Sequence, residues 1–116
     1  MLGAAQYLAD HIHEAPVWIV PCLEGAAPTR TAGSSIYPAV QNMVLACRAL
    51  GLGTTLTTRH MLYQKEADKA LGLPDGVHSY AILPIGWPMG KFGPVGRGPL
   101  NDIVYQDRWG QPYAGV

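Results

Sequence analysis

The feature that most constrains the fold is a long, mostly apolar stretch at residues 34–58, SSIYPAVQNMVLACRALGLGTTLTT. Its first hydroxyl residues suit a helix cap, Pro38 then falls in the first turn, and Gly51 suits the left-handed position after a helix. Apolar residues recur at the spacing of one helical face, and alanines with Leu45 fill most of the remaining surface. Such a helix is typical of burial on nearly every side. The pattern predicts a buried central helix followed by a β-branched strand at 54–58.

The rest of the chain alternates short regular segments with loops, which predicts a single α+β domain over residues 1–116. An apolar run at 17–23 predicts a strand covered on both faces, although Pro21 indicates an edge position or an early end to pairing. Five glycines and three prolines at 86–99 predict a loop that lies close to a ligand or another backbone. The other expected elements are a helix at 4–12, a loop at 24–33, a helix at 59–73 capped by Thr58 with its apolar face on a sheet, a strand at 80–85 and a tail at 100–113.

The composition indicates a partner subunit. Hydrophobic residues make up 48% of the chain and charged residues only 14%, against roughly 25% charged in typical soluble domains. A small domain so poor in charge exposes apolar surface, which marks interfaces, and the aromatic residues of the tail need a place to dock.

The formal net charge of zero gives no electrostatic basis for binding nucleic acid or an anionic membrane. No apolar run is long enough to span a bilayer, and the first residues lack the pattern of a secretory signal. The two cysteines, Cys22 and Cys47, are expected to be free thiols, which is typical of a cytoplasmic protein.

The familiar catalytic groupings are weak. There is no phosphate loop of the G-x-x-x-x-G-K-[ST] form and no G-x-G-x-x-G motif. His11 and His13 are two residues apart on a predicted helix and point away from each other, so no metal site is expected. A set of Ser35, His60 and Asp102 can be assembled on paper, but no spacing favours hydrolysis. The sequence therefore assigns no catalytic side chain.

Four segments, in matching order, resemble the flavin-dependent nitroreductase family. They are HEAPVWIVPC at 13–22, AVQNMVLACRALGLGTTLTT at 39–58, YAILPIGWP at 80–88 and GRGPLNDIVYQDRWG at 96–110. The resemblance implies the C-terminal half of the family fold, a mixed sheet with the central helix packed across it. It also implies that the family's N-terminal half, which carries an Arg/Ser-rich flavin phosphate motif, is missing.

The same resemblance implies an activity. Family members reduce nitroaromatics, quinones or similar small electrophiles with NAD(P)H through FMN, as homodimers with the flavin between subunits. The cofactor brings the reactive atom, so such an enzyme needs no acid–base motif of its own. Two alternatives stay open. One is a non-enzymatic dimerising remnant that has lost flavin binding, and the other is a relative that uses flavin for dehalogenation or breaks down the flavin itself.

The resemblance also implies candidate flavin contacts. Arg97, between two glycines, matches the basic residue that meets the phosphate, although it also fits a solvated loop charge; Lys91 is a weaker second. Ile36, Tyr37 and Pro38 fit an apolar wall of the site or the core. The stretch beside the reactive edge of the flavin ring, which also fits an ordinary Thr-rich strand, comprises Thr55, Leu56, Thr57 and Thr58.

Overall fold

The structure, a computed structural model, describes residues 2–25 and 28–115 and confirms the α+β class. Ala26 and Ala27, in the predicted loop 24–33, lie outside the described residues. In chain order the elements are α1 (Leu2–His11), β1 (Val17–Ile19), β2 (Cys22–Glu24), α2 (Arg30–Ala49), β3 (Gly53–Thr54), α3 (Gln64–Ala70), β4 (Val77–Ser79) and β5 (Leu83–Gly86), with short 3-10 turns at Ile12–Glu14, Arg59–Tyr63 and Leu100–Asp102. No helix in the described part of the chain is long and apolar enough to cross a membrane.

The strands form two small antiparallel sheets, one in the order β1-β5-β3 and one pairing β2 with β4. The predicted strand at 17–23 is therefore divided into β1 and β2. Of their partners, β5 overlaps the predicted strand at 80–85, whereas β4 lies before it and was not predicted. Ile19 lies opposite Leu83 in one sheet and Cys22 opposite Ser79 in the other, so two residues on one side face three on the other. The extra residue forms a bulge on the side of residues 80–82, opposite Val20 and Pro21, where the sequence predicts that pairing ends. All of β1 is exposed in one chain, contrary to the prediction of cover on both faces.

The predicted strand at 54–58 is interrupted. Regular pairing of β3 ends at Thr54, opposite Ile85, and resumes as a single bridge between Thr57 and Ile82 in the same register. Pro84 lies between these two pairs on the facing strand. Because proline has no N–H to donate, the ladder loses a hydrogen bond at this point.

Helix α2 begins four residues earlier than predicted, at Arg30 rather than Ser34. The Thr29 side chain caps it by accepting a hydrogen bond from the Ala32 amide at 3.1 Å. Pro38 consequently lies inside the helix and not in its first turn, which corrects the prediction. The predicted end is confirmed, since the helix stops at Ala49 and Gly51 has a φ of 76°.

The core lies between α2 and the sheets. Ile36 and Val40 on the helix pack with Tyr80 and Leu83, and Val40 and Leu83 are both fully buried. The sequence predicts that α2 is buried on nearly every side, but in a single chain only one face of the helix is buried. Its outer face includes Leu45, which is 56% exposed. Cys22 and Cys47 are free thiols, as predicted.

The predicted helix at 59–73 is a 3-10 turn followed by the short α3. Thr58 makes no capping hydrogen bond, which corrects the sequence prediction. Leu62, expected on the apolar face that covers a sheet, is 74% exposed. The tighter 3-10 winding displaces the side chains from the positions that a 3.6-residue repeat assigns to them.

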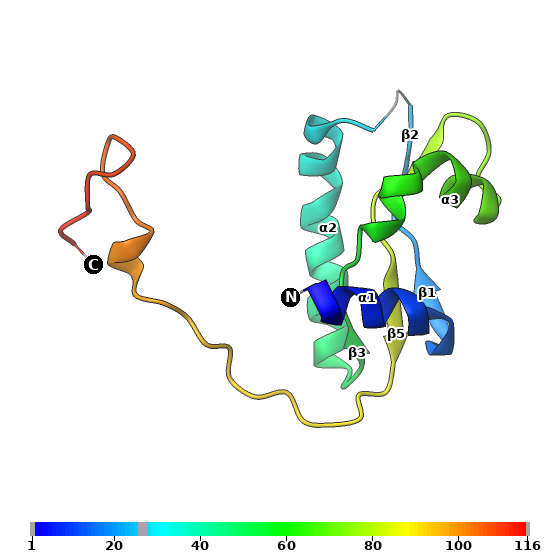
Figure 1. Ribbon diagram of the computed structural model, residues 1–116, viewed down its shortest axis with the longest axis horizontal. Coiled ribbons are helices and arrows are strands. Elements are labelled where there is room, and N and C mark those ends of the chain that lie inside the picture. The colour runs from blue at the N-terminus through cyan, green and yellow to red at the C-terminus, as the bar shows by residue number, and fades with distance from the viewer. Residues whose placement is uncertain (1, 26–27, 116) are drawn as a thin grey trace.

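The C-terminal segment leaves the folded body. After β5 the chain runs without regular pairing through residues 87–99, as predicted for this Gly/Pro-rich stretch, and reaches the short turn Leu100–Asp102 and the tail well away from the sheets (Figure 1). We call residues 87–115 the arm. Near its start, the Arg48 guanidinium lies 4.6 Å from the centre of the Phe92 ring, which ties the arm to the end of α2.

Candidate functional site

The candidate site begins with backbone amides at an open sheet edge. Thr57 exchanges both backbone hydrogen bonds with Ile82, at 3.1 and 2.9 Å. Because N–H groups alternate along an extended chain, the amides of Leu56 and Thr58 are directed away from β5. On that side β3 is the last strand of its sheet. Among the described residues, none accepts a hydrogen bond from either amide. This edge offers two donors to a ligand.

The side chains of this segment leave the edge accessible. Thr55, Leu56 and Thr58 are exposed, and Thr57 is half-buried. Beside the segment, a cavity of about 420 Å³ is lined by Thr54, Thr55, Pro84, Trp87, Pro88 and Phe92, among others. A planar apolar group therefore has both backbone donors and aromatic surface within the same region of the fold.

The two candidate cations lie on the arm. Arg97 and Lys91 are exposed, and the only hydrogen bond of the Arg97 side chain among the described residues is to the Gly96 carbonyl at 3.4 Å. Arg97 belongs to the arm, and the arm leaves the folded body that contains β3 (Figure 1). A single chain therefore does not bring the predicted phosphate contact and the predicted ring contacts together.

The three residues predicted to form an apolar wall of the site, Ile36, Tyr37 and Pro38, do not lie in one environment. Ile36 is buried in the core, and the Tyr37 hydroxyl donates a 2.8 Å hydrogen bond to the Tyr80 carbonyl. Burial raises the pKa of the Tyr37 phenol, and the neighbouring Tyr80 adds to this. Pro38 alone is exposed. Ile36 and Tyr37 are thus packing residues of one chain.

A buried polar network, which the sequence analysis missed, joins α3 to β4. The Asp68 carboxylate accepts hydrogen bonds from the Ser79 amide at 3.2 Å, from the Ser79 hydroxyl and from Gln64 Nε2 at 2.9 Å. His78 Nδ1 lies 3.2 Å from its second oxygen. His60 Nε2 lies 3.0 Å from the Ser79 hydroxyl oxygen. The network fixes α3 against the sheet.

The surroundings shift the ionisation of two members of this network. Burial raises the pKa of the Asp68 carboxyl, but hydrogen bonds from Ser79, Gln64 and His78 outweigh it, so the pKa lies below the usual 3.8. Burial lowers the pKa of His60 below the usual 6.5, and the Asp68 charge only partly opposes this. At neutral pH Asp68 is therefore ionised and His60 is neutral.

The set of Ser35, His60 and Asp102 does not assemble. The Ser35 hydroxyl donates to the Thr31 carbonyl at 3.4 Å, His60 contacts Ser79, and Asp102 lies on the arm. Ser79, Asp68 and His60 do meet, but Ser79 is fully buried and gives its proton to the carboxylate. A serine nucleophile must be accessible to substrate and must give its proton to a histidine base. Ser79 meets neither condition, so this grouping is structural.

Comparison with known proteins assigns the family. The model of the nitroreductase family matches residues 3–87, which is most of the chain. The chain belongs to the nitroreductase family. No protein of curated function matches it by sequence.

Solved nitroreductase-like structures share the fold. A nitroreductase-like family protein from Bacillus cereus superposes with a TM-score of 0.68 at 19% identity, over 90% of this chain and 58% of that one. A putative NADH dehydrogenase/NAD(P)H nitroreductase from Parabacteroides distasonis gives 0.67 at 23% identity, over 89% and 68%. An iodotyrosine deiodinase bound to FMN and 3-iodo-L-tyrosine gives 0.65 at 22%, over 89% and 56%. The nitroreductase chain thus spans between 56% and 68% of the length of these structures.

Proposed function

We propose that this chain acts as an FMN-dependent NAD(P)H oxidoreductase that reduces nitroaromatics, quinones or similar small electrophiles. The observation that carries the proposal is the open sheet edge at Leu56 and Thr58. It lies within the segment matched by the nitroreductase family model. Amides at such an edge suit the carbonyl and ring-nitrogen acceptors of a flavin ring.

In this proposal the chain supplies position and charge. When bound, FMN supplies the ring that accepts and passes on a hydride. The amides of Leu56 and Thr58 hold the ring edge, with Thr55 and Thr57 completing that stretch. Arg97 holds the phosphate, and Lys91 adds positive charge near it. Because the arm carries Arg97 beyond its own folded body, a second copy of the chain completes the site.

We expect the chain to form a homodimer in solution. The exposed outer face of α2 and the aromatic arm supply the apolar surface that an obligate interface of more than about 2,000 Å² needs. Sedimentation at micromolar concentration should give a species of twice the 12.4 kDa chain mass. A single monomeric species across the micromolar range would contradict the shared site.

Removing the Arg97 guanidinium is expected to weaken FMN selectively. A charge-assisted contact to the phosphate contributes roughly 1.5–3 kcal/mol, so Arg97→Ala should weaken FMN about ten- to a hundred-fold. Riboflavin has no phosphate and should bind Arg97→Ala and the parent chain nearly alike. Both flavins are titrated by quenching of their fluorescence.

The matched control is Arg108→Ala, which removes a second exposed arginine of the arm and should leave both affinities unchanged. Equal losses of FMN and riboflavin in Arg97→Ala would give Arg97 a structural role. No binding of either flavin by the parent chain would favour a dimerising remnant. With flavin bound, nitroaromatics are compared with halogenated phenols, because the deiodinase has a similar fold.

A further inference from the structure

His60 joins the segment that forms the open edge to the polar network. It belongs to the turn Arg59–Tyr63, which follows Thr58 directly. Its Nε2 lies 3.0 Å from the Ser79 hydroxyl oxygen on β4. Within the turn, the Met61 amide donates to the Thr58 carbonyl at 3.0 Å. The conformation of Thr58, whose amide is one of the two edge donors, therefore depends on how His60 holds the turn.

The polar network decides which nitrogen of His60 carries the ring proton. The Ser79 hydroxyl has one proton and gives it to the Asp68 carboxylate, which only accepts. Towards His60 the Ser79 oxygen is therefore an acceptor, so His60 Nε2 is the donor. Nδ1 of the neutral ring holds a lone pair. It is thus the atom that any further proton must join.

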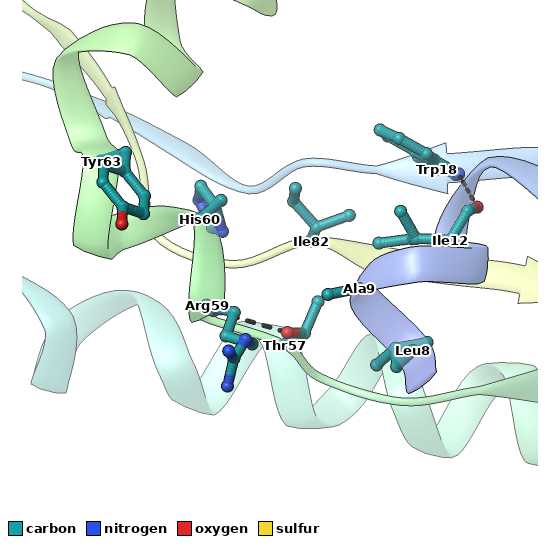
Figure 2. Close-up of a pocket in the computed structure, with 9 residues that line it drawn as sticks. All are labelled: Leu8, Ala9, Ile12, Trp18, Thr57, Arg59, His60, Tyr63 and Ile82. Carbon is teal, nitrogen blue, oxygen red and sulfur yellow. Dashed lines mark hydrogen bonds between the residues drawn. The ribbon is translucent and has the colours of Figure 1, made fainter. Parts of the chain in front are cut away.

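The surroundings of Nδ1 do not suit a proton. This atom has essentially no accessible surface, and no described residue forms a hydrogen bond with it. Figure 2 shows His60 with the other residues that line the adjoining cavity of about 270 Å³, most of which are apolar. A buried, charged N–H without an acceptor is costly. Protonation of His60 therefore favours a conformation in which the ring leaves its place.

The charges around His60 only partly oppose this effect. Asp68 on α3 attracts a protonated ring, but burial outweighs it, so the pKa of His60 lies below the usual 6.5. His78 on β4 lies 3.2 Å from the same carboxylate, and Arg59 and Tyr63 share the turn with His60. The described residues that α1, β1 and the chain before β5 contribute to the cavity carry no charge; they are Leu8, Ala9, Ile12, Trp18 and Ile82.

We propose that His60 is a pH-sensitive positioning residue, which holds Thr58 at the open edge while its ring is neutral and releases the turn when its ring is protonated. The link to flavin rests on the proposed function. In the released turn His60 has its usual pKa of about 6.5, and in the closed turn it has a lower one. Release therefore becomes easier as pH falls from about 6.5 towards the lower value, and it is suppressed above this range.

Hydrogen exchange of the Met61 amide, followed by NMR on the ¹⁵N-labelled chain, measures this release. In the parent, the opening equilibrium constant should rise by up to about tenfold for each pH unit between about 6.5 and the folded-state pKa of His60. Amides of α2 should show no such rise. His60→Gln keeps a donor for the Ser79 oxygen but cannot be protonated, so its Met61 opening constant should not depend on pH.

The matched control is His78→Gln, which removes the other imidazole of the network and should keep the pH dependence of the parent. Equal pH dependence in parent and His60→Gln would overturn the proposal, and so would its loss in His78→Gln. If His60→Gln does not fold, the parent chain still decides. The ¹⁵N resonances of its His60 ring should show the proton on Nε2 at neutral pH, and a proton on Nδ1 there would overturn the proposal.

Riboflavin tests the coupling to the edge, because it lacks the FMN phosphate, which itself titrates near about pH 6. At about ten times its dissociation constant, riboflavin should slow exchange of the Met61 amide about tenfold, since it binds the closed turn. Riboflavin that binds without slowing this exchange would refute the coupling. If no flavin binds, the proposed function fails, whereas the exchange of Met61 in parent and His60→Gln still decides the role of His60.

Discussion

Replacing Asp68 by alanine is expected to lower the free energy of unfolding by about 3 kcal/mol, because it removes the acceptor at the centre of a buried network. The Asp68 carboxylate is the partner of the Ser79 amide, the Ser79 hydroxyl and Gln64 Nε2. Without it, the amide of the fully buried Ser79 loses the acceptor that it has in the parent chain. Urea unfolding of parent and variant measures the difference.

Two controls accompany this result. Asp75→Ala removes a carboxylate from an exposed turn and should change stability by less than about 0.5 kcal/mol. The pH dependence tests the charge. The folded-state pKa of Asp68 lies below its usual 3.8, so its contribution is fully present above that value and is lost as pH falls through the folded-state pKa. The stability difference between parent and Asp68→Asn should shrink in that acid range. A difference that does not vary with pH would contradict the ionised network.

Leu83→Ala should also cost about 3 kcal/mol, because it opens a cavity where α2 meets the sheet. Leu83 has no exposed surface and packs with Val40 and Tyr80. Leu62→Ala, the same change at a residue 74% exposed, should stay within about 0.5 kcal/mol. Urea unfolding measures the loss. The shift of the denaturation midpoint reports the change in stability if the m-value is the same in parent and variant. Similar losses at both positions would mean that the core lies elsewhere.

Local chemistry explains which elements could be predicted. The end of α2 at Gly51 and the break at Pro21 follow from the conformations that glycine and proline allow. The start of α2 was misplaced because Thr29 and Ser34 are both suitable caps, and only tertiary packing selects between them. The interruption of β3 depends on Pro84, which is distant in sequence from the strand that it interrupts.

The candidate site was predictable only in part. The resemblance drew attention to residues 55–58, but which amides are open depends on how Thr57 pairs with Ile82. The network around Asp68 was missed because its members come from three elements. One signal was present in the sequence: Gln64 and Asp68 are four residues apart, so they share a helix face and meet at 2.9 Å. Which partners they find across the fold is not encoded in that spacing.

The open edge at Leu56 and Thr58 also makes the protein prone to aggregation. Unpaired amides in an extended, uncharged segment are a template on which another extended chain can add, and such addition begins amyloid-like association. Here no lysine, glutamate or proline interrupts residues 53–58 to prevent it. Whatever covers this edge in the working protein is also its protection against aggregation, so solubility and occupancy of the edge should rise and fall together.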